Sequence, residues 1–170
     1  KSAVLEGLPT PPYRRKLEIL SSSINLPVGL HQFLNNLKQL YTLEISYQRC
    51  KPTFNHQYAL SRLKNDGYKI AVCSNSVRQS IETMMSLSKL SDYLDLILSN
   101  QDVDIGKPNP MIYQMAMKTL GVKPDECLIL EDNEHGIQAA LASGGHLLKI
   151  GLPVDVTYQA IKARIDSLEK

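Results

Sequence analysis

The stretch CLILEDNEHGIQAALASG, residues 127–144, decides the fold of this chain. Its apolar run 128–130 leads directly into two adjacent acids, Glu131 and Asp132. Polar residues follow, and after Gly136 the apolar residues recur at helical spacing. This pattern predicts a buried strand, a short turn and an amphipathic helix. It also places two carboxylates that repel each other at the end of a buried strand.

Strands and helices are expected to alternate through the whole second half of the sequence. Short apolar, β-branched runs predict strands at 68–74, 93–100, 127–132 and 146–150. Helical spacing predicts helices at 77–88, 109–121 and 155–169, with one more between the last two strands. This alternation predicts an α/β fold, with a parallel, Rossmann-like sheet covered by helices on both faces.

The first half of the sequence shows helical patterns only, at 12–22, 27–49 and 53–66. We expect a small helical unit over residues 7–50, and an α/β unit over 51–170 together with residues 1–6. One apolar stripe of the helical unit is expected to pack in a core; it consists of Leu30, Phe33, Leu34, Leu37, Leu40 and Tyr41.

The composition of the chain argues against two classes of binding partner, nucleic acids and membranes. The formal net charge is +2 and the basic residues are dispersed, so no nucleic-acid footprint is present. No apolar run approaches the ~20 residues that span a bilayer. The three cysteines, Cys50, Cys73 and Cys127, are far apart and odd in number. These cysteines favour reduced thiols in a cytoplasmic protein. The charge pattern and the short apolar runs predict that the protein binds neither nucleic acid nor membrane.

Polar side chains follow three of the predicted strands. Ser74 and Asn75 follow the first, Lys107 lies in the loop after the second, and Glu131 and Asp132 end the third. Each alone has an ordinary explanation, such as a helix N-cap, a solvated cation or acids that favour a helix N-terminus. Together they place a hydroxyl, a cation and an anion pair at the sheet edge where ligands bind in α/β proteins.

This set of groups suits a phosphoryl group and a divalent metal. Phosphoryl oxygens need donors and a cation, and Mg²⁺ prefers hard carboxylate oxygens. A Mg²⁺ ion beside Glu131 and Asp132 would also relieve the repulsion between them. The sequence therefore predicts Mg²⁺ as the cofactor.

The segments AVCSNS (71–76), GKPNPMIY (106–113) and CLILEDNEHGIQAA (127–140) resemble motifs two, three and four of the haloacid dehalogenase superfamily. The helical unit resembles the cap of its β-phosphoglucomutase and phosphoglycolate phosphatase branch. The resemblance implies that Ser74 and Lys107 hold the transferred phosphoryl group, and that Asn75 adds a phosphate contact. It further implies that Asp132 binds Mg²⁺, with Glu131 as a second ligand or as a partner behind it.

The family's first motif, a strand followed by DxDx[TV], does not occur in this sequence. In the family that motif supplies the nucleophilic aspartate, and its strand lies at the centre of the sheet. The DVDIG segment at 102–106 has the DxD spacing, but it directly precedes Lys107 and is expected to be a loop. Without the central strand, two apolar strand edges would be unpaired. We expect an upstream segment to supply it; the alternatives are a strand-donating partner or a natural pseudoenzyme.

The segment GLPTPPYRRK at 7–16 resembles the cap loop that reaches over the active site in this branch. It makes Thr10, Arg14 and Arg15 candidate substrate contacts, although a solvated helix face explains the arginines equally well. The resemblance implies a Mg²⁺-dependent phosphatase acting on a small phosphorylated metabolite, such as a phosphosugar or phosphoglycolate. A sugar-phosphate mutase and an inactive phosphate-binding module are the alternatives.

Overall fold

The computed structural model describes residue 27 and residues 29–169. The helix expected at 12–22 and the candidate contacts Thr10, Arg14 and Arg15 lie outside the described residues.

Four short strands form inside the four predicted ranges, and they pair in parallel. Strand β1 (Ala71–Cys73) pairs with β2 (Leu96–Leu98), so that Val72 lies opposite Ile97. Strand β3 (Leu128–Glu131) pairs with β4 (His146–Lys149), so that Ile129 lies opposite Leu147. The expected α/β fold is confirmed.

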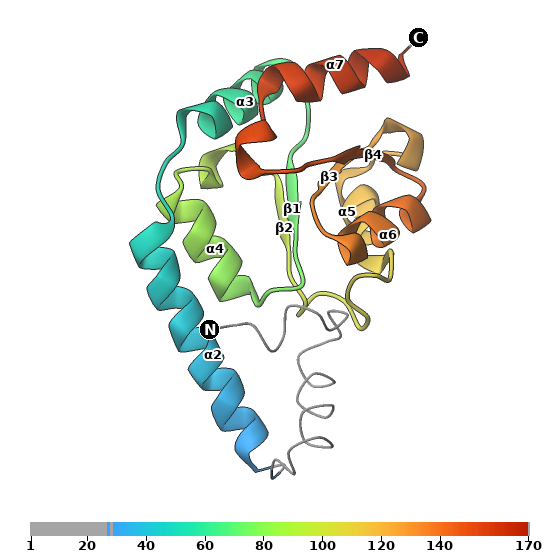
Figure 1. Cartoon of the computed structure of the whole chain (residues 1–170). Helices are drawn as coiled ribbons and strands as arrows, with labels where there is room; N and C mark the ends of the chain where they lie inside the picture. Colours follow the sequence, from blue (N-terminus) through green and yellow to red (C-terminus); the bar gives the residue numbers. More distant parts are fainter. Residues whose placement is uncertain (1–26, 28, 170) are drawn as a thin grey trace.

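Six described helices surround the strands (Figure 1). They are α2 (Leu30–Arg49), α3 (Phe54–Asn65), α4 (Arg78–Leu87), α5 (Met111–Leu120), α6 (Glu134–Ser143) and α7 (Tyr158–Leu168). The side chains of Asn133 and Thr157 cap α6 and α7 by accepting from backbone N–H groups. Gly121, with φ of 66°, ends α5 in the left-handed conformation that glycine adopts without strain.

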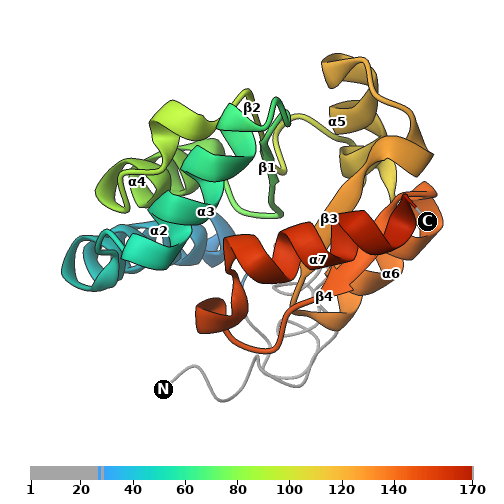
Figure 2. The ribbon, with the colours of Figure 1, turned by 90° about the horizontal axis from the view of Figure 1, so that it is seen from above.

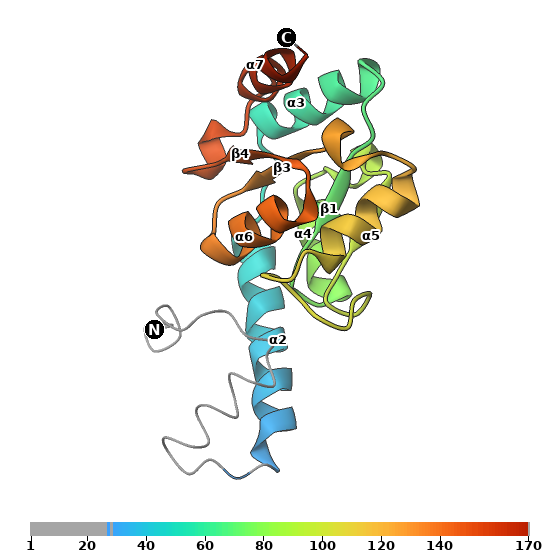
Figure 3. The ribbon, with the colours of Figure 1, turned by 90° about the vertical axis from the view of Figure 1, so that its right-hand side faces the viewer.

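The core lies where α5 and α6 pack against the strands. Helix α5 packs against β1, β2 and α6, and α6 packs against β3 and β4. Ile112, Ala139 and Ala140 are fully buried there. Helices α3 and α7 pack side by side, and Figures 1 and 3 show them together at the end of the molecule where the chain finishes.

The parallel strands form two separate two-stranded sheets, in the orders β1-β2 and β3-β4. In the view from above, the two pairs stand apart (Figure 2). No strand among the described residues joins β1 to β3. The gap lies where the resemblance places the missing central strand.

The apolar stripe of α2 is much less buried than expected. Phe33, Leu40 and Tyr41 are 60%, 65% and 57% exposed in the described structure, and Ser46 is the buried residue of α2. The helix packs against α4, and its amino-terminal half extends beyond the strands (Figure 3). The core-packing expectation for this stripe was therefore wrong, because only one end of α2 reaches the α/β unit.

None of the described helices is long and apolar enough to cross a membrane.

Candidate functional site

The segments that carry the predicted site residues meet at the carboxyl ends of β1 and β3. Asn75, just after β1, is joined to Lys107 twice: its Nδ2 donates to the Lys107 carbonyl at 3.0 Å, and its Oδ1 accepts from the Lys107 N–H at 2.9 Å. The Lys107 ammonium in turn contacts the Glu131 carboxylate at the end of β3. Lys107 therefore connects the ends of the two half-sheets.

Glu131 is held on all sides. Its Oε1 accepts from Lys107 Nζ and from the Tyr113 hydroxyl, and its Oε2 accepts from Asn133 Nδ2 at 3.2 Å. Both Lys107 and Glu131 are only 7% exposed. This buried ion pair explains how a strand can end in two acids, because a fixed cation and two further donors stabilise the inner carboxylate.

Gly136 makes room for that carboxylate. A Cβ at this position would lie 2.1 Å from the Glu131 carboxyl carbon. Gly136 also donates its N–H to Asn133 Oδ1 at 2.9 Å, which caps α6. The first turn of α6 therefore approaches Glu131 so closely that a side chain at 136 would displace it.

Tyr113 of α5 is a site residue that the sequence did not single out. Its hydroxyl donates to Glu131, and the Lys107 ammonium lies 4.8 Å from its ring centroid. Burial, followed by the neighbouring Glu131 carboxylate, raises the pKa of the Tyr113 hydroxyl well above its usual range. The phenol therefore stays a neutral donor. Its signal was a polar-tipped aromatic residue on an otherwise apolar helix face, where a partner for the hydroxyl is needed.

Ser74 and Asp132 are less constrained than the residues beside them. The Ser74 Oγ accepts from the Ser76 N–H at 3.1 Å, and its own N–H donates to Leu98 in β2 at 3.0 Å. Asp132 is exposed and accepts from Asn133 Nδ2 at 3.4 Å. Both are neighbours in the sequence of members of the Asn75–Lys107–Glu131 network.

The donor set at the strand ends fits a metal only in part. Both carboxylate oxygens of Glu131 already accept hydrogen bonds, from Lys107, Tyr113 and Asn133. These contacts favour a positioning role for Glu131 over metal ligation. Asp132 offers an exposed carboxylate. No group of three or more His, Cys, Asp or Glu side chains within the described part of the chain could hold a metal. Mg²⁺ usually binds through one or two carboxylates, with water and phosphate oxygens completing its shell, and Asp132 suits that arrangement.

The DVDIG segment is a loop, as expected. Asp102 accepts from Arg78 Nη2 at 2.8 Å and from the Ser99 hydroxyl at 2.6 Å. Its hydrogen bonds with Ser99, and then Arg78, hold the pKa of the Asp102 carboxyl below its usual range. This aspartate fixes the loop after β2 and is not available as a nucleophile.

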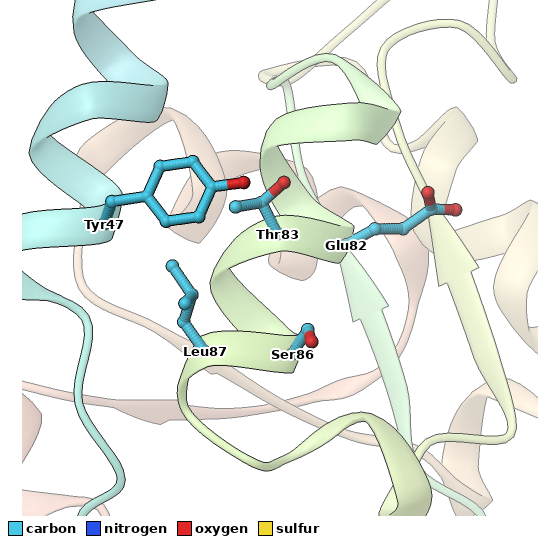
Figure 4. Close-up of a pocket in the computed structure, with 5 residues that line it drawn as sticks. All are labelled: Tyr47, Glu82, Thr83, Ser86 and Leu87. Carbon is cyan, nitrogen blue, oxygen red and sulfur yellow. The ribbon is translucent and has the colours of Figure 1, made fainter.

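A shallow hollow of about 290 Å³ lies between α2 and α4 (Figure 4). Tyr47 of α2 points towards α4, where Thr83 and Leu87 face it, and Glu82 points away. Glu82 pairs with Arg78 on its own helix. The hollow contains none of the predicted site residues.

The chain has a parallel α/β fold, with a lysine–glutamate pair and polar side chains at the carboxyl ends of its strands. These features define a class of ligand-binding α/β proteins. Residues 10–150 match the model of the haloacid dehalogenase-like hydrolases, and the chain belongs to that family.

Individual relatives agree with this assignment. Pyrophosphatase PpaX from Bacillus cereus (strain AH820) is 36% identical over 85 residues, which cover 50% of this chain and 39% of that protein. PpaX from Bacillus mycoides is 32% identical over 108 residues, or 50% of its length. The chain therefore spans half or less of these curated relatives.

Solved structures show the same fold. β-Phosphoglucomutase from Clostridium difficile superposes with a TM-score of 0.75 at 19% identity, covering 92% of this chain and 78% of that one. CbbY from Rhodobacter sphaeroides, solved in complex with phosphate, has a TM-score of 0.52 at 26% identity over 54% of this chain and 42% of its own.

Proposed function

We propose that this chain carries the phosphate-binding part of a Mg²⁺-dependent phosphohydrolase that acts on small phosphate monoesters. The observation that supports this most is the network Asn75–Lys107–Glu131, because it fixes a cation at the point where β1 and β3 end. A buried, positioned cation stabilises the charge that develops on a transferring phosphoryl group.

The described residues take separate roles in this proposal. Ser74 donates its hydroxyl to a phosphoryl oxygen, and Lys107 supplies the positive charge. Glu131 and Tyr113 hold the ammonium in place, so they act through Lys107 and not on the substrate. Asp132 would hold Mg²⁺, which shields the phosphoryl oxygens when bound. The aspartyl-phosphate route would also need an aspartate beside Lys107, and the DxDx[TV] motif that provides it in the family does not occur in this sequence.

The substrate class is a small phosphorylated metabolite of the phosphosugar or phosphoglycolate type. Phosphate bound to CbbY and the pyrophosphatase relatives support a phosphate ester or anhydride. The β-phosphoglucomutases that share the fold keep a sugar-phosphate mutase as the second candidate. The two would differ in whether the phosphoryl group passes to water or to a second sugar hydroxyl.

Binding of inorganic phosphate, followed by ³¹P NMR with and without Mg²⁺, tests the proposal on this chain. We expect saturable binding that Mg²⁺ strengthens, and we expect Asp132→Asn to remove the Mg²⁺ effect while leaving the fold intact, since Asp132 is exposed. Asp125→Asn is the matched control, because Asp125 is an exposed acid before the start of β3, at its opposite end. Equal Mg²⁺ dependence in all three proteins would contradict the metal role of Asp132.

A further inference from the structure

We infer that Asn75 is a positioning residue, which clamps the main chain at Lys107 and so holds the ammonium where a phosphoryl group would bind. The inference rests on the proposed function, and it gives Asn75 a role that differs from a direct contact with phosphate. Its basis is the pair of hydrogen bonds that join the Asn75 side chain to the Lys107 main chain.

The two hydrogen bonds require an amide side chain of this length. Asn75 Oδ1 accepts from the Lys107 N–H at 2.9 Å, and Asn75 Nδ2 donates to the Lys107 carbonyl at 3.0 Å. One side chain thus satisfies both main-chain groups of a single residue. An aspartate would set a second acceptor against the carbonyl, and a hydroxyl would offer one oxygen for two partners. The contact therefore fixes the orientation of the Lys107 main chain as well as its distance.

Gly106 makes room for the amide. A Cβ at position 106 would lie 2.7 Å from Asn75 Oδ1 and 3.2 Å from Asn75 Cγ. Glycine permits such a close approach, whereas any other residue would push the amide away from Lys107. The glycine before Lys107 and the asparagine after β1 therefore form one contact, although they are far apart in the sequence.

The loop that leads to Lys107 has a second anchor, further from the cation. Asp102 of this loop accepts from Arg78 Nη2 at 2.8 Å. Arg78 is the first residue of α4, so this anchor and Asn75 both belong to the segment that follows β1. Residues 104–105, between the two anchors, are exposed. Loss of the Asn75 contact would therefore release the end of the loop that carries the cation, while Arg78 still holds the other end.

The position of the Lys107 main chain matters because the charge of this residue is buried. The Lys107 side chain is 8% exposed and contacts Glu131, so the ammonium has little freedom to compensate for a shift of its own backbone. Ser74, whose hydroxyl is the proposed donor, directly precedes Asn75. The clamp thus holds the segment with the hydroxyl and the segment with the cation in a fixed register. Asn75 acts through Lys107, and its loss weakens phosphate binding by misplacing the cation.

Two measurements test the inference together: hydrogen exchange of the Lys107 amide by NMR, and titration with inorganic phosphate followed by ³¹P NMR. We expect Asn75→Ala to speed exchange at the Lys107 N–H by about tenfold or more, because its hydrogen bond is lost. The phosphate affinity should fall by about tenfold or more. Exchange at the Ser74 N–H, which donates to Leu98 in β2, should stay the same and report an intact fold. Asn65→Ala, at the exposed end of α3, is the matched control and should change neither quantity.

Gly106→Ala separates positioning from direct contact, because it displaces the amide without changing the chemistry of Asn75. A positioning role predicts that Gly106→Ala reproduces both effects of Asn75→Ala, and that the double variant is no worse than either single variant. Additive losses of phosphate affinity in the double variant would overturn the inference, since they would show a separate contact of Asn75 with phosphate. Unchanged exchange at Lys107 in Asn75→Ala would overturn it whether or not the chain binds phosphate. Absence of phosphate binding by the unsubstituted chain would contradict the proposed function, and the exchange at Lys107 would then decide the inference alone.

Discussion

Glu131 and Lys107 form the interaction on which the geometry of the candidate site depends. Their side chains are 7% and 8% exposed, so each charge has lost most of its water and relies on the other. Removing one member of such a buried pair leaves an uncompensated charge, which costs far more than breaking a surface pair.

We expect Glu131→Gln to lower the free energy of unfolding by ~3–5 kcal/mol, measured by urea denaturation. The double variant Lys107→Met with Glu131→Gln should recover part of that loss, because no unpaired charge remains. Lys64→Met is the control: it breaks the Lys64–Asp95 pair, whose side chains are 34% and 29% exposed, and should cost at most ~1 kcal/mol. Lys107→Met alone completes the comparison. If its change in the free energy of unfolding and that of Glu131→Gln simply add in the double variant, the two side chains are not coupled.

The Cys73 thiol should be protected from alkylation by its surroundings. Burial raises the pKa of Cys73 from 9.0 to about 12. At pH 8 the native thiolate fraction is then roughly a thousandfold smaller than in the unfolded chain. We expect iodoacetamide labelling at Cys73, followed by peptide mass spectrometry, to be slower in the native protein than in urea by two to three orders of magnitude (~100–1,000-fold).

The raised pKa of Cys73 also determines how the stability of the fold depends on pH. The unfolded thiol ionises first, so the contribution of Cys73 to stability is complete below pH 9 and is lost as the pH rises from there towards 12. Labelling of native Cys73 at the rate seen in urea would contradict the partly buried placement of this side chain.

At the scale of a single element, the turn between β3 and α6 is the most constrained part of the site. A Cβ on Gly136 would lie 2.4 Å or less from both Glu131 carboxylate oxygens. Those oxygens cannot move aside without leaving Lys107, Tyr113 or Asn133. Glycine is therefore required at position 136, because the backbone there lies so close to the Glu131 carboxylate.

Gly136→Ala is therefore expected to lower the free energy of unfolding by roughly 1–3 kcal/mol, even though alanine favours a helix. Gly29→Ala, at the start of α2 with no atom within 4 Å of the added Cβ, should change it by at most ~0.5 kcal/mol. Thermal or urea unfolding of both variants compares them directly. A neutral Gly136→Ala would mean that Glu131 does not occupy this position in solution.

The strands and helices of the second half could be predicted from the sequence, because each has its own local period and its own stop signals. The stretch 127–144 gave β3, the turn and α6 almost to the residue. The parallel topology also predicted that the segments after β1 and β3 meet Lys107, and the contacts of Asn75 and Glu131 with Lys107 agree with it. The Lys107–Glu131–Tyr113 contacts did not, because they depend on how α5 packs against β1 and β2. The exposure of Phe33 likewise depends on packing that the stripe itself does not encode.

At the scale of the whole molecule, the central feature is a sheet divided between two strand pairs. The parallel pairs β1-β2 and β3-β4 face each other across a cavity, and their carboxyl ends share one lysine. A closed sheet would bury that cavity and place a fifth strand beside Ser74 and Lys107. Catalysis would therefore depend on what occupies the space between β1 and β3.

Hydrolysis of p-nitrophenyl phosphate with Mg²⁺, measured with and without a synthetic peptide of about five apolar β-branched residues followed by one aspartate, tests this claim most directly. We predict no turnover by the chain alone, turnover on addition of the peptide that ends in aspartate, and none with the same peptide ending in asparagine. Turnover by the chain alone that neither peptide alters would contradict the account, because the nucleophile would then lie within these 170 residues.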